Sequence, residues 1–348
     1  MNNKIVFLCN CLHKGGAQRV LVSLANNMAE QGFDVSIIAS FDNGTYQLHD
    51  GIKVKYVGCG KYLKFIKVSR TEIKKIQPLV VISFEYFINL FACIACLGLK
   101  TKLIISERND PSRVGSGFIK DKIRNFLYCF ADILVCQTPD AKAYFPHYIQ
   151  KKTVIIPNPL KPNLPYKYLG QRKKKVVTFC RLNSQKNLPM LIKAFHEFSK
   201  THSDYSLSIY GDGEEKSNIE NLVKQYNLTS KVSIFKSCDN IHDLVIDSAM
   251  FVLPSNYEGL SNSMLEALAI GLPTICTDCP CGGARMIIET EKNGLLIPVG
   301  DTNALIKAMS KVADNNSFAE RLSNEGLKLR DYLSIKAISN KWISLFSI

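Results

Sequence analysis

Short aliphatic and β-branched runs alternate with amphipathic stretches along the chain, and this alternation limits the possible folds more than any other feature of the sequence. A buried strand, then a helix, then another buried strand is typical of a parallel sheet covered by helices. The pattern therefore predicts an α/β protein.

The alternation occurs twice. In the first half we expect strands at residues 4–9, 34–39, 79–83, 102–106, 132–137 and 153–156, with helices beginning near Ala17, Phe65, Tyr86, Gly117 and Pro139. In the second half we expect strands at residues 176–180, 205–210, 232–235, 250–253, 274–276 and 295–298, with helices beginning near Leu188, Glu214, Ile241, Ser261, Ala284 and Thr302. Each half therefore reads as a doubly wound, Rossmann-like domain.

Prolines separate the two halves, at positions 157, 159, 162 and 165. Proline clusters of this kind interrupt regular structure. We expect one domain over residues 1–160, a linker over 161–175 and a second domain over 176–348, whose last helix crosses back to the first domain. Ligands of such proteins bind in crevices at the carboxyl ends of strands, so the cleft between the domains is the expected site.

Positive charge is concentrated in the first half of the chain. The net charge is +14, from 44 Lys and Arg against 30 Asp and Glu. Residues 1–175 carry 27 basic and 11 acidic side chains, a balance of +16, whereas residues 176–348 carry 17 and 19, a balance of −2. A basic half suits nucleic acid, an anionic membrane or phosphorylated ligands. The clusters at 61–75 and 172–175 favour a binding role over a merely solvated surface.

Other features exclude whole classes of protein. The apolar stretch 86–99 is too short to cross a bilayer and is interrupted by Asn89, and no small-residue cleavage site follows the first strand, so we expect neither a membrane span nor a signal peptide. The 12 cysteines lie mostly in apolar runs, as expected in a reducing cytoplasm. The pairs Cys93/Cys96 and Cys276/Cys279 lack matching histidines, which disfavours zinc.

The second half carries the strongest constellation, Glu258-Gly259-Leu260-Ser261-Asn262-Ser263-Met264-Leu265-Glu266, directly after a predicted buried strand. Gly259 permits a tight turn, and Ser261 or Asn262 can cap the helix that follows. The amides at that helix terminus suit a diphosphate, and the flanking carboxylates Glu258 and Glu266 suit sugar hydroxyls. An arbitrary pair of glutamates would more often be a cap and a surface residue, so the assignment depends on its context.

That context includes two cations. Arg181 and Lys186 follow the strand at 176–180, and two cations can clamp one diphosphate. In the first half, Gly15 and Gly16 precede a helix and allow backbone to approach a phosphate. The full G-x-G-x-x-G pattern and an acidic residue after the second strand are both missing, which argues against an NAD enzyme.

Four further motifs complete the pattern: Gly15-Gly16-Ala17-Gln18-Arg19, Ile156-Pro157-Asn158-Pro159, Gly211-Asp212-Gly213 and Asn293-Gly294-Leu295-Leu296. With Glu-x7-Glu, they make the chain resemble the family 4 retaining glycosyltransferases of the GT-B fold over essentially its whole length. The segment 279–285 is similar to that of transferases that build bacterial surface polysaccharides and lipid-linked oligosaccharides.

The resemblance implies a role for each site residue. Arg181 and Lys186 would neutralise the donor diphosphate, Glu266 would hold the ribose and Glu258 would contact the donor sugar. The remaining donor-binding positions would be Gly15, Gly16, Gly211, Gly259, Leu260, Ser261 and Asn262. Many family members have a histidine after the strand at 102–106, but this chain has Ser106-Glu107-Arg108-Asn109, so we expect Glu107 or Arg108 to take the donor-sugar position.

The resemblance also implies the reaction. We expect retaining transfer of a hexose or N-acetylhexosamine from a nucleotide-sugar, UDP more than GDP, to a polyprenyl-diphosphate-linked or glycan acceptor, with no cofactor. No Asp-x-Asp motif is seen and the cations can neutralise the diphosphate, so we expect no metal. The basic stretch formed by Lys61, Lys64, Lys67, Arg70, Lys74 and Lys75 would contact an anionic membrane. The expected location is peripheral, on the cytoplasmic face of the inner membrane.

Two alternatives differ in class. A nucleotide-sugar epimerase could use the same two-domain architecture, although Glu-x7-Glu and the basic first half disfavour it. A nucleic-acid-binding protein would suit the net charge, but no zinc finger, aromatic-studded strand pair or recognition helix is evident. We therefore expect no nucleic-acid partner.

Overall fold

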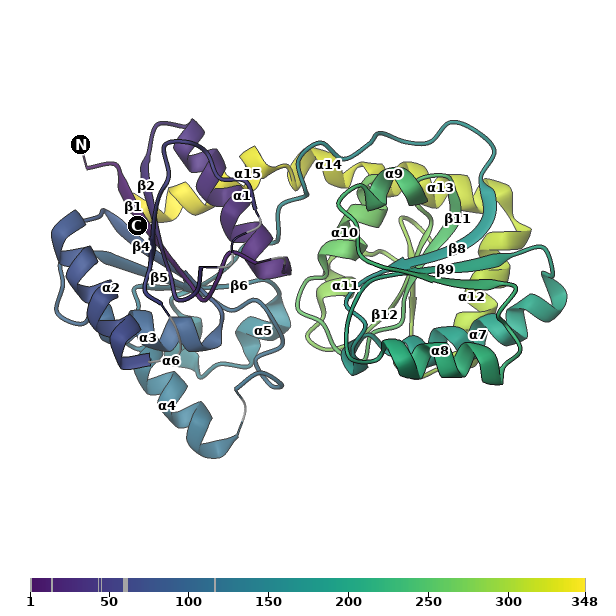
Figure 1. The fold of residues 1–348 in the computed structure, drawn as a ribbon, viewed down its shortest axis with the longest axis horizontal. Coiled ribbons are helices and arrows are strands. Elements are labelled where there is room, and N and C mark those ends of the chain that lie inside the picture. Colours follow the sequence, from purple (N-terminus) through teal and green to yellow (C-terminus); the bar gives the residue numbers. More distant parts are fainter. Residues whose placement is uncertain are drawn as a thin grey trace. The chain divides into compact units, whose positions relative to one another are not determined.

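The computed structural model describes residues 2–13, 15–42, 44, 46–58, 62–115 and 117–347. Lys61, one of the predicted membrane contacts, lies outside the described residues. The chain divides into a first unit, Met1–Pro159 with Leu333–Ile348, and a second unit, Leu160–Tyr332. In each unit helices cover both faces of a parallel sheet (Figure 1).

The first unit is built on a seven-stranded sheet with the order β3-β2-β1-β4-β5-β6-β7. Its strands are β1 (Lys4–Cys9), β2 (Asp34–Ala39), β3 (Lys53–Tyr56), β4 (Val80–Phe84), β5 (Lys102–Ser106), β6 (Ile133–Cys136) and β7 (Thr153–Ile155). At the centre, Phe7 of β1 pairs with Ile37 of β2 and Ile82 of β4, and all three are fully buried. Near-continuous aliphatic strands of this kind are expected when both faces of a parallel sheet are covered.

Two sets of helices cover this sheet. The helices of the first unit are α1 (Gly16–Glu30), α2 (Tyr62–Ile76), α3 (Tyr86–Cys96), α4 (Phe118–Tyr128), α5 (Pro139–Ala143), α6 (His147–Gln150) and α15 (Ile335–Ile343), followed by a 3-10 turn at Ser344–Ser347. Helices α1 and α15 pack together on one face, while α2, α3 and α4 lie side by side on the other (Figure 1).

The C-terminal segment is fixed to the first unit by specific contacts. The fully buried Trp342 lies 5.6 Å from Phe84, centroid to centroid. The ammonium of Lys102 donates to the carbonyl oxygens of Leu345 and Phe346 at 3.2 and 3.1 Å. The C-terminal segment therefore packs on the sheet that contains β1.

The second unit is built on a six-stranded sheet with the order β10-β9-β8-β11-β12-β13. Its strands are β8 (Lys173–Phe179), β9 (Ser206–Tyr210), β10 (Val232–Phe235), β11 (Ser248–Leu253), β12 (Thr274–Thr277) and β13 (Leu295–Ile297). Its helices are η1 (Ser184–Lys186, a 3-10 turn), α7 (Leu188–Thr201), α8 (Lys216–Gln225), α9 (Ile241–Val245), α10 (Asn262–Ala269), α11 (Gly283–Ile287), α12 (Thr302–Asp314), α13 (Asn316–Leu327) and α14 (Leu329–Tyr332). Helices α7, α8 and α12 lie on one face, and α10 and α13 on the other (Figure 1).

The predicted fold class, two Rossmann-like domains with parallel sheets, is confirmed. Strand β3 was not predicted, because its Lys-Val-Lys-Tyr sequence is short and half exposed at the sheet edge. Among the described residues no helix is both long enough and apolar enough to span a bilayer.

The basic run 172–175 has a local role that its charge alone did not suggest. Arg172 donates to the carbonyl oxygens of Ile246, Ser248 and Gly271. The three lysines that follow are the first residues of strand β8, where Lys173 and Lys175 pair with Asp247 and Lys174 with Asp204. These contacts give the run a structural role at the start of the second sheet, while Lys173 and Lys174 stay exposed.

Candidate functional site

The strand order of the second sheet indicates where a ligand binds. The chain winds outward in both directions from the neighbouring strands β8 and β11, which makes their carboxyl ends the topological switch point. Open α/β sheets bind ligands at such a point. The loop after β8 carries Arg181 and Lys186, and the loop after β11 carries Glu258, so the predicted residues gather at this edge.

Close backbone packing fixes the loop after β8. A Cβ on Gly211 would overlap the carbonyl oxygen of Cys180, and one on Gly213 would overlap that of Leu182. The amide of Leu182 donates to the carbonyl oxygen of Asp212 at 2.8 Å. The two glycines of the Gly211-Asp212-Gly213 motif thus allow the close backbone contact that positions the segment bearing Arg181 and Lys186.

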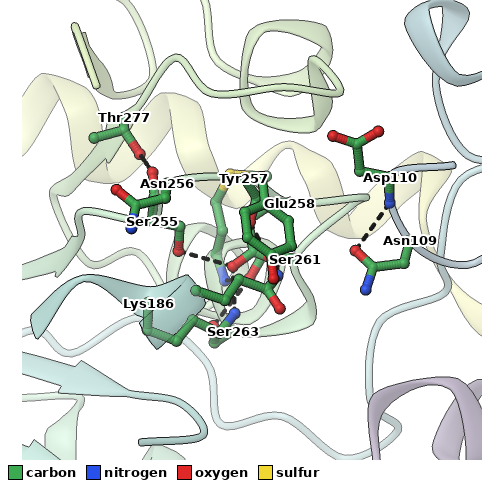
Figure 2. Close-up of polar contacts among 12 residues, drawn as sticks. Asn109, Asp110, Lys186, Ser255, Asn256, Tyr257, Glu258, Ser261, Ser263 and Thr277 are labelled. Atoms are coloured by element: carbon green, nitrogen blue, oxygen red, sulfur yellow. Dashed lines mark hydrogen bonds and ion pairs between the residues drawn. The ribbon is translucent and has the colours of Figure 1, made fainter. Parts of the chain in front are cut away.

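Glu258 is the centre of a buried polar cluster (Figure 2). It forms an ion pair with Lys186, and the Ser255 hydroxyl donates to its Oε1 at 2.8 Å. Gln185 donates to its Oε2 at 3.2 Å and to the Tyr257 carbonyl oxygen at 2.9 Å. The two residues that hydrogen-bond to Glu258, Gln185 and Ser255, were not predicted as site residues, although both are within three residues of one.

The backbone around Glu258 is held as firmly as its side chain. Its amide donates to the Pro280 carbonyl oxygen at 2.6 Å, and its own carbonyl oxygen accepts from the Cys281 amide at 2.7 Å. Gly283 packs so closely that a Cβ there would overlap the Gly259 carbonyl oxygen. The loop after β11 is therefore preorganised by the loop after β12.

The second glutamate, Glu266, has a different partner. It lies on α10, 7% exposed, and its Oε2 is 2.8 Å from Nε2 of the buried His242 on α9. The ring of Phe179 contacts the His242 ring edge-on, at 5.7 Å between centroids. His242 was not among the predicted site residues, because a histidine 24 residues away in the sequence carries no local sign of this contact.

The electrostatics of the cluster favour a charged lysine. Burial alone would lower the pKa of Lys186, but the carboxylate of Glu258 outweighs it, so the pKa of Lys186 is raised. Burial also raises the pKa of Cys180 to about 11 and that of Cys279 to about 12, so both thiols are neutral at pH 7. Lys186 is therefore positively charged at pH 7, and the thiols beside it are neutral.

The other predicted residues of the second unit surround this cluster. Arg181 is exposed at the end of β8. Ser261 caps α10, its hydroxyl accepting from the Met264 amide, and Leu260 and Asn262 flank the cap. The positive end of α10 thus lies directly after Glu258 in the chain. An ammonium, a guanidinium and a helix terminus suit a diphosphate, and the carboxylates suit hydroxyl groups.

The glycine turn of the first unit is already engaged by neighbouring side chains. The Gly15 amide donates to the Tyr46 hydroxyl oxygen at 3.2 Å, and that hydroxyl donates to the Gly15 carbonyl oxygen at 3.1 Å. Gln18 on the first turn of α1 donates to Glu85 at 2.6 Å. Gly16, the first residue of α1, lies between them in the chain. This turn follows β1 at the switch point of the first sheet, beside β4.

Glu107 and Arg108 follow β5 but point to separate partners. The buried Glu107 accepts a hydrogen bond from Tyr128, which also contacts Asn89 at 3.3 Å. Burial raises the pKa of Glu107, although the Tyr128 hydroxyl and Arg124 partly offset it. Arg108 donates to Asn158 and lies 4.6 Å from the Phe84 ring centroid, and burial lowers its pKa to about 9. Both residues are thus part of a buried network at the carboxyl edge of the first sheet.

The predicted membrane-contact residues lie on α2. Lys64, Lys67, Lys74 and Lys75 are exposed, whereas the Arg70 guanidinium donates to the carbonyl oxygens of Ala95 and Leu97 at 2.9 and 2.7 Å. Arg70 therefore fastens α2 to the end of α3. The four lysines lie on the solvated face of the helix, opposite its buried residues Phe65, Ser69 and Ile73.

Comparison with known proteins decides the class. Residues 14–164 match the model described as Glycosyltransferase Family 4, and residues 167–329 match the one described as Glycosyl transferases group 1. The chain is a glycosyltransferase of the GT-B type. The two matched regions nearly coincide with the two units, and the second contains the whole Lys186–Glu258 and His242–Glu266 arrangement.

One curated relative spans nearly the whole chain. It is the GalNAc-alpha-(1->4)-GalNAc-alpha-(1->3)-diNAcBac-PP-undecaprenol alpha-1,4-N-acetyl-D-galactosaminyltransferase of Campylobacter jejuni, 29% identical over 99% of this chain and 98% of its own length. The glycosyltransferase also resembles two solved structures in fold. Sucrose-phosphate synthase from Thermosynechococcus elongatus has a TM-score of 0.87 at 18% identity, covering 99% of this chain and 98% of its own. HepE from Anabaena in complex with UDP has a TM-score of 0.86 at 16% identity, covering 99% of both chains.

Proposed function

We propose that this glycosyltransferase moves a hexose or an N-acetylhexosamine from a UDP-sugar to a polyprenyl-diphosphate-linked acceptor, with retention of the anomeric configuration and without a metal ion. The observation that carries the proposal is the buried Lys186–Glu258 pair, which is supported by Ser255 and Gln185. Glu258 lies on the loop that leads into the N-terminus of α10. The related Campylobacter transferase, named for a diphosphate-undecaprenol substrate, and the UDP bound to HepE support this choice of acceptor and donor.

Charge development explains why these residues would accelerate the reaction. Negative charge grows on the diphosphate as the anomeric bond breaks, and fixed positive groups aimed at that charge lower the barrier. Lys186, Arg181 and the α10 terminus would supply them, so a divalent cation is not needed for neutralisation. Glu266, oriented by His242, would accept hydrogen bonds from the ribose hydroxyls, and Glu258 would accept one from the donor sugar.

Retention follows in this proposal from departure and attack on the same face of the sugar. The leaving diphosphate takes up the proton of the acceptor hydroxyl, so no protein nucleophile forms a covalent intermediate. Peripheral attachment at an anionic membrane would bring the enzyme to its lipid-linked acceptor.

A transfer assay tests the proposal. The enzyme is incubated with UDP-hexoses and UDP-N-acetylhexosamines, a polyprenyl-diphosphate-linked acceptor and EDTA, and the anomeric configuration of the product is read by NMR. We expect transfer with retention. We also expect Lys186→Met and Glu266→Gln to lower it by about two orders of magnitude or more, as loss of one preorganised electrostatic group commonly does. The controls away from the site, the exposed Lys193→Met and the half-exposed Glu220→Gln, should retain it. Transfer that stops in EDTA or survives both site variants would overturn the proposal.

A further inference from the structure

Helix α4 is amphipathic, but its orientation is the reverse of the usual one because its apolar side faces solvent. Phe118, Ile119, Ile123 and Phe126 are 75, 71, 50 and 64% exposed. They are spaced one, four and three residues apart, so they form one stripe along the helix. An ordinary surface helix buries such a stripe and exposes its polar side.

The polar side of α4 holds it to the rest of the first unit. Arg124 is fully buried, pairs with Asp121 at 2.8 Å and donates to the Pro111 carbonyl oxygen at 3.1 Å. Tyr128 is fully buried and donates to Glu107. The orientation of α4 is therefore fixed by a buried polar network, and the apolar stripe is presented outward by construction.

Positive charge lies beside and within this stripe, because Lys122 is four residues from both Phe118 and Phe126. Lys120 and Lys122 are exposed on α4, and the Lys122 ammonium lies 4.1 Å from the Phe118 ring centroid. The carboxylate of the helix, Asp121, is turned to Arg124. The neighbouring helix α3 adds the exposed Phe87 and Ile94, and α2, which packs against α3, adds its lysine face. Aromatic and aliphatic side chains with flanking lysines are typical of helices that lie in a membrane interface.

We propose that the stripe of Phe118, Ile119, Ile123 and Phe126 inserts into the interface of an anionic bilayer, so that α4 lies in the membrane plane. The excess of basic residues in the first half of the chain matches an anionic surface and argues for lipid over a second protein. This inference rests on the proposed function, because the lipid-linked acceptor is the reason why the enzyme would bind a membrane. It differs from the predicted contact by the α2 lysines in assigning the apolar contact to α4.

Vesicle sedimentation and quenching test the insertion. A variant with Phe118→Gln, Ile119→Gln, Ile123→Gln and Phe126→Gln changes only exposed side chains. Its matched control carries Leu169→Gln, Phe235→Gln, Leu244→Gln and Val299→Gln, four exposed apolar positions of the second unit. With vesicles of phosphatidylcholine and phosphatidylglycerol, we expect the α4 variant to bind at least roughly tenfold more weakly and the control to bind normally. Equal binding of both variants, or absence of vesicle binding by the unchanged protein, would overturn the inference.

Depth of insertion separates α4 from the α2 lysines. In a Phe126→Trp variant, lipids brominated in their acyl chains should quench the new fluorescence, while the buried Trp342 is protected. Replacing Lys64, Lys67, Lys74 and Lys75 by Gln should remove mainly the salt-sensitive part of binding and leave the quenching. Absence of quenching, or an α4 variant that loses self-association in place of vesicle binding, would contradict insertion and point to a second copy as the partner.

Failure of this inference can be told apart from failure of the proposed function. The α4 variant should keep UDP binding, which belongs to the second unit, and should lose transfer only to an acceptor embedded in vesicles. Normal transfer by this variant on vesicles would refute the α4 surface and leave the proposed reaction intact. Vesicle binding through α4 without any UDP binding would support the α4 surface and refute the proposed reaction.

Discussion

At the scale of single residues, the site depends on an ion pair in which each buried charge is compensated by its partner. Lys186 and Glu258 are both largely buried, and removing one partner of such a pair leaves an uncompensated charge. We expect Lys186→Met to destabilise the second unit by about 3 kcal/mol, and the double variant Lys186→Met/Glu258→Gln to recover most of that loss. Calorimetry is the appropriate measurement, because the single tryptophan belongs to the first unit. Additive losses in the double variant would show that the pair is not coupled.

Glu107 offers a pH test in the first unit. Burial raises its pKa in the folded protein, so the native state binds this proton more tightly than the unfolded chain. Its charged form therefore lowers stability above the folded pKa, and this cost disappears as the pH falls below the ordinary glutamate value. Relative to Glu107→Gln, the unchanged protein should become more stable from pH 7 towards pH 4. Trp342 fluorescence during urea unfolding follows this directly, and a constant or growing deficit on acidification would contradict it.

At the scale of elements, the site is formed by loops whose backbones touch. Gly283→Ala should displace the Glu258 loop, because the added Cβ meets backbone atoms of Gly259 and Leu260. We expect a loss of roughly 1–3 kcal/mol, as for other overpacked sites, and a fall in transfer of at least tenfold. The control is Gly300→Ala, which has a φ of +77° but no atom within 4 Å of its Cβ, so it should lose stability and keep activity. Equal transfer by the two variants would mean that the contact does not position Glu258.

The elements also show which features of the structure could be predicted from the sequence. The switch-point residues, the helix cap at Ser261 or Asn262 and every described strand except β3 were predictable from local periodicity and turn chemistry. The partners of the two glutamates were not. His242 reaches Glu266, and Ser255 and Gln185 reach Glu258, only through tertiary packing. Helix α4 was predicted as an element, but its inverted orientation depends on Glu107 and Pro111 accepting hydrogen bonds from its polar side.

At the scale of the whole molecule, each sheet has its own switch point and its own polar cluster. The second unit combines cations, a helix terminus and two supported carboxylates, which suits a nucleotide-sugar. The first unit has an engaged glycine turn, a buried Glu107 network and an outward apolar helix, which suits an acceptor brought by a membrane. This difference between the two units is the central claim of the account, and it requires the second unit to make the main contacts with the nucleotide.

The most direct test is calorimetric unfolding of the enzyme, its Glu266→Gln variant and the Glu220→Gln control with UDP, GDP, CMP, ADP and NAD. A ligand at about 100 times its Kd stabilises by roughly 2.7 kcal/mol, which raises the Tm by a few degrees. The account predicts that UDP raises the transition of the second unit in the unchanged enzyme and the control, and much less in Glu266→Gln. A response to NAD alone, or a UDP response unchanged in Glu266→Gln, would contradict it.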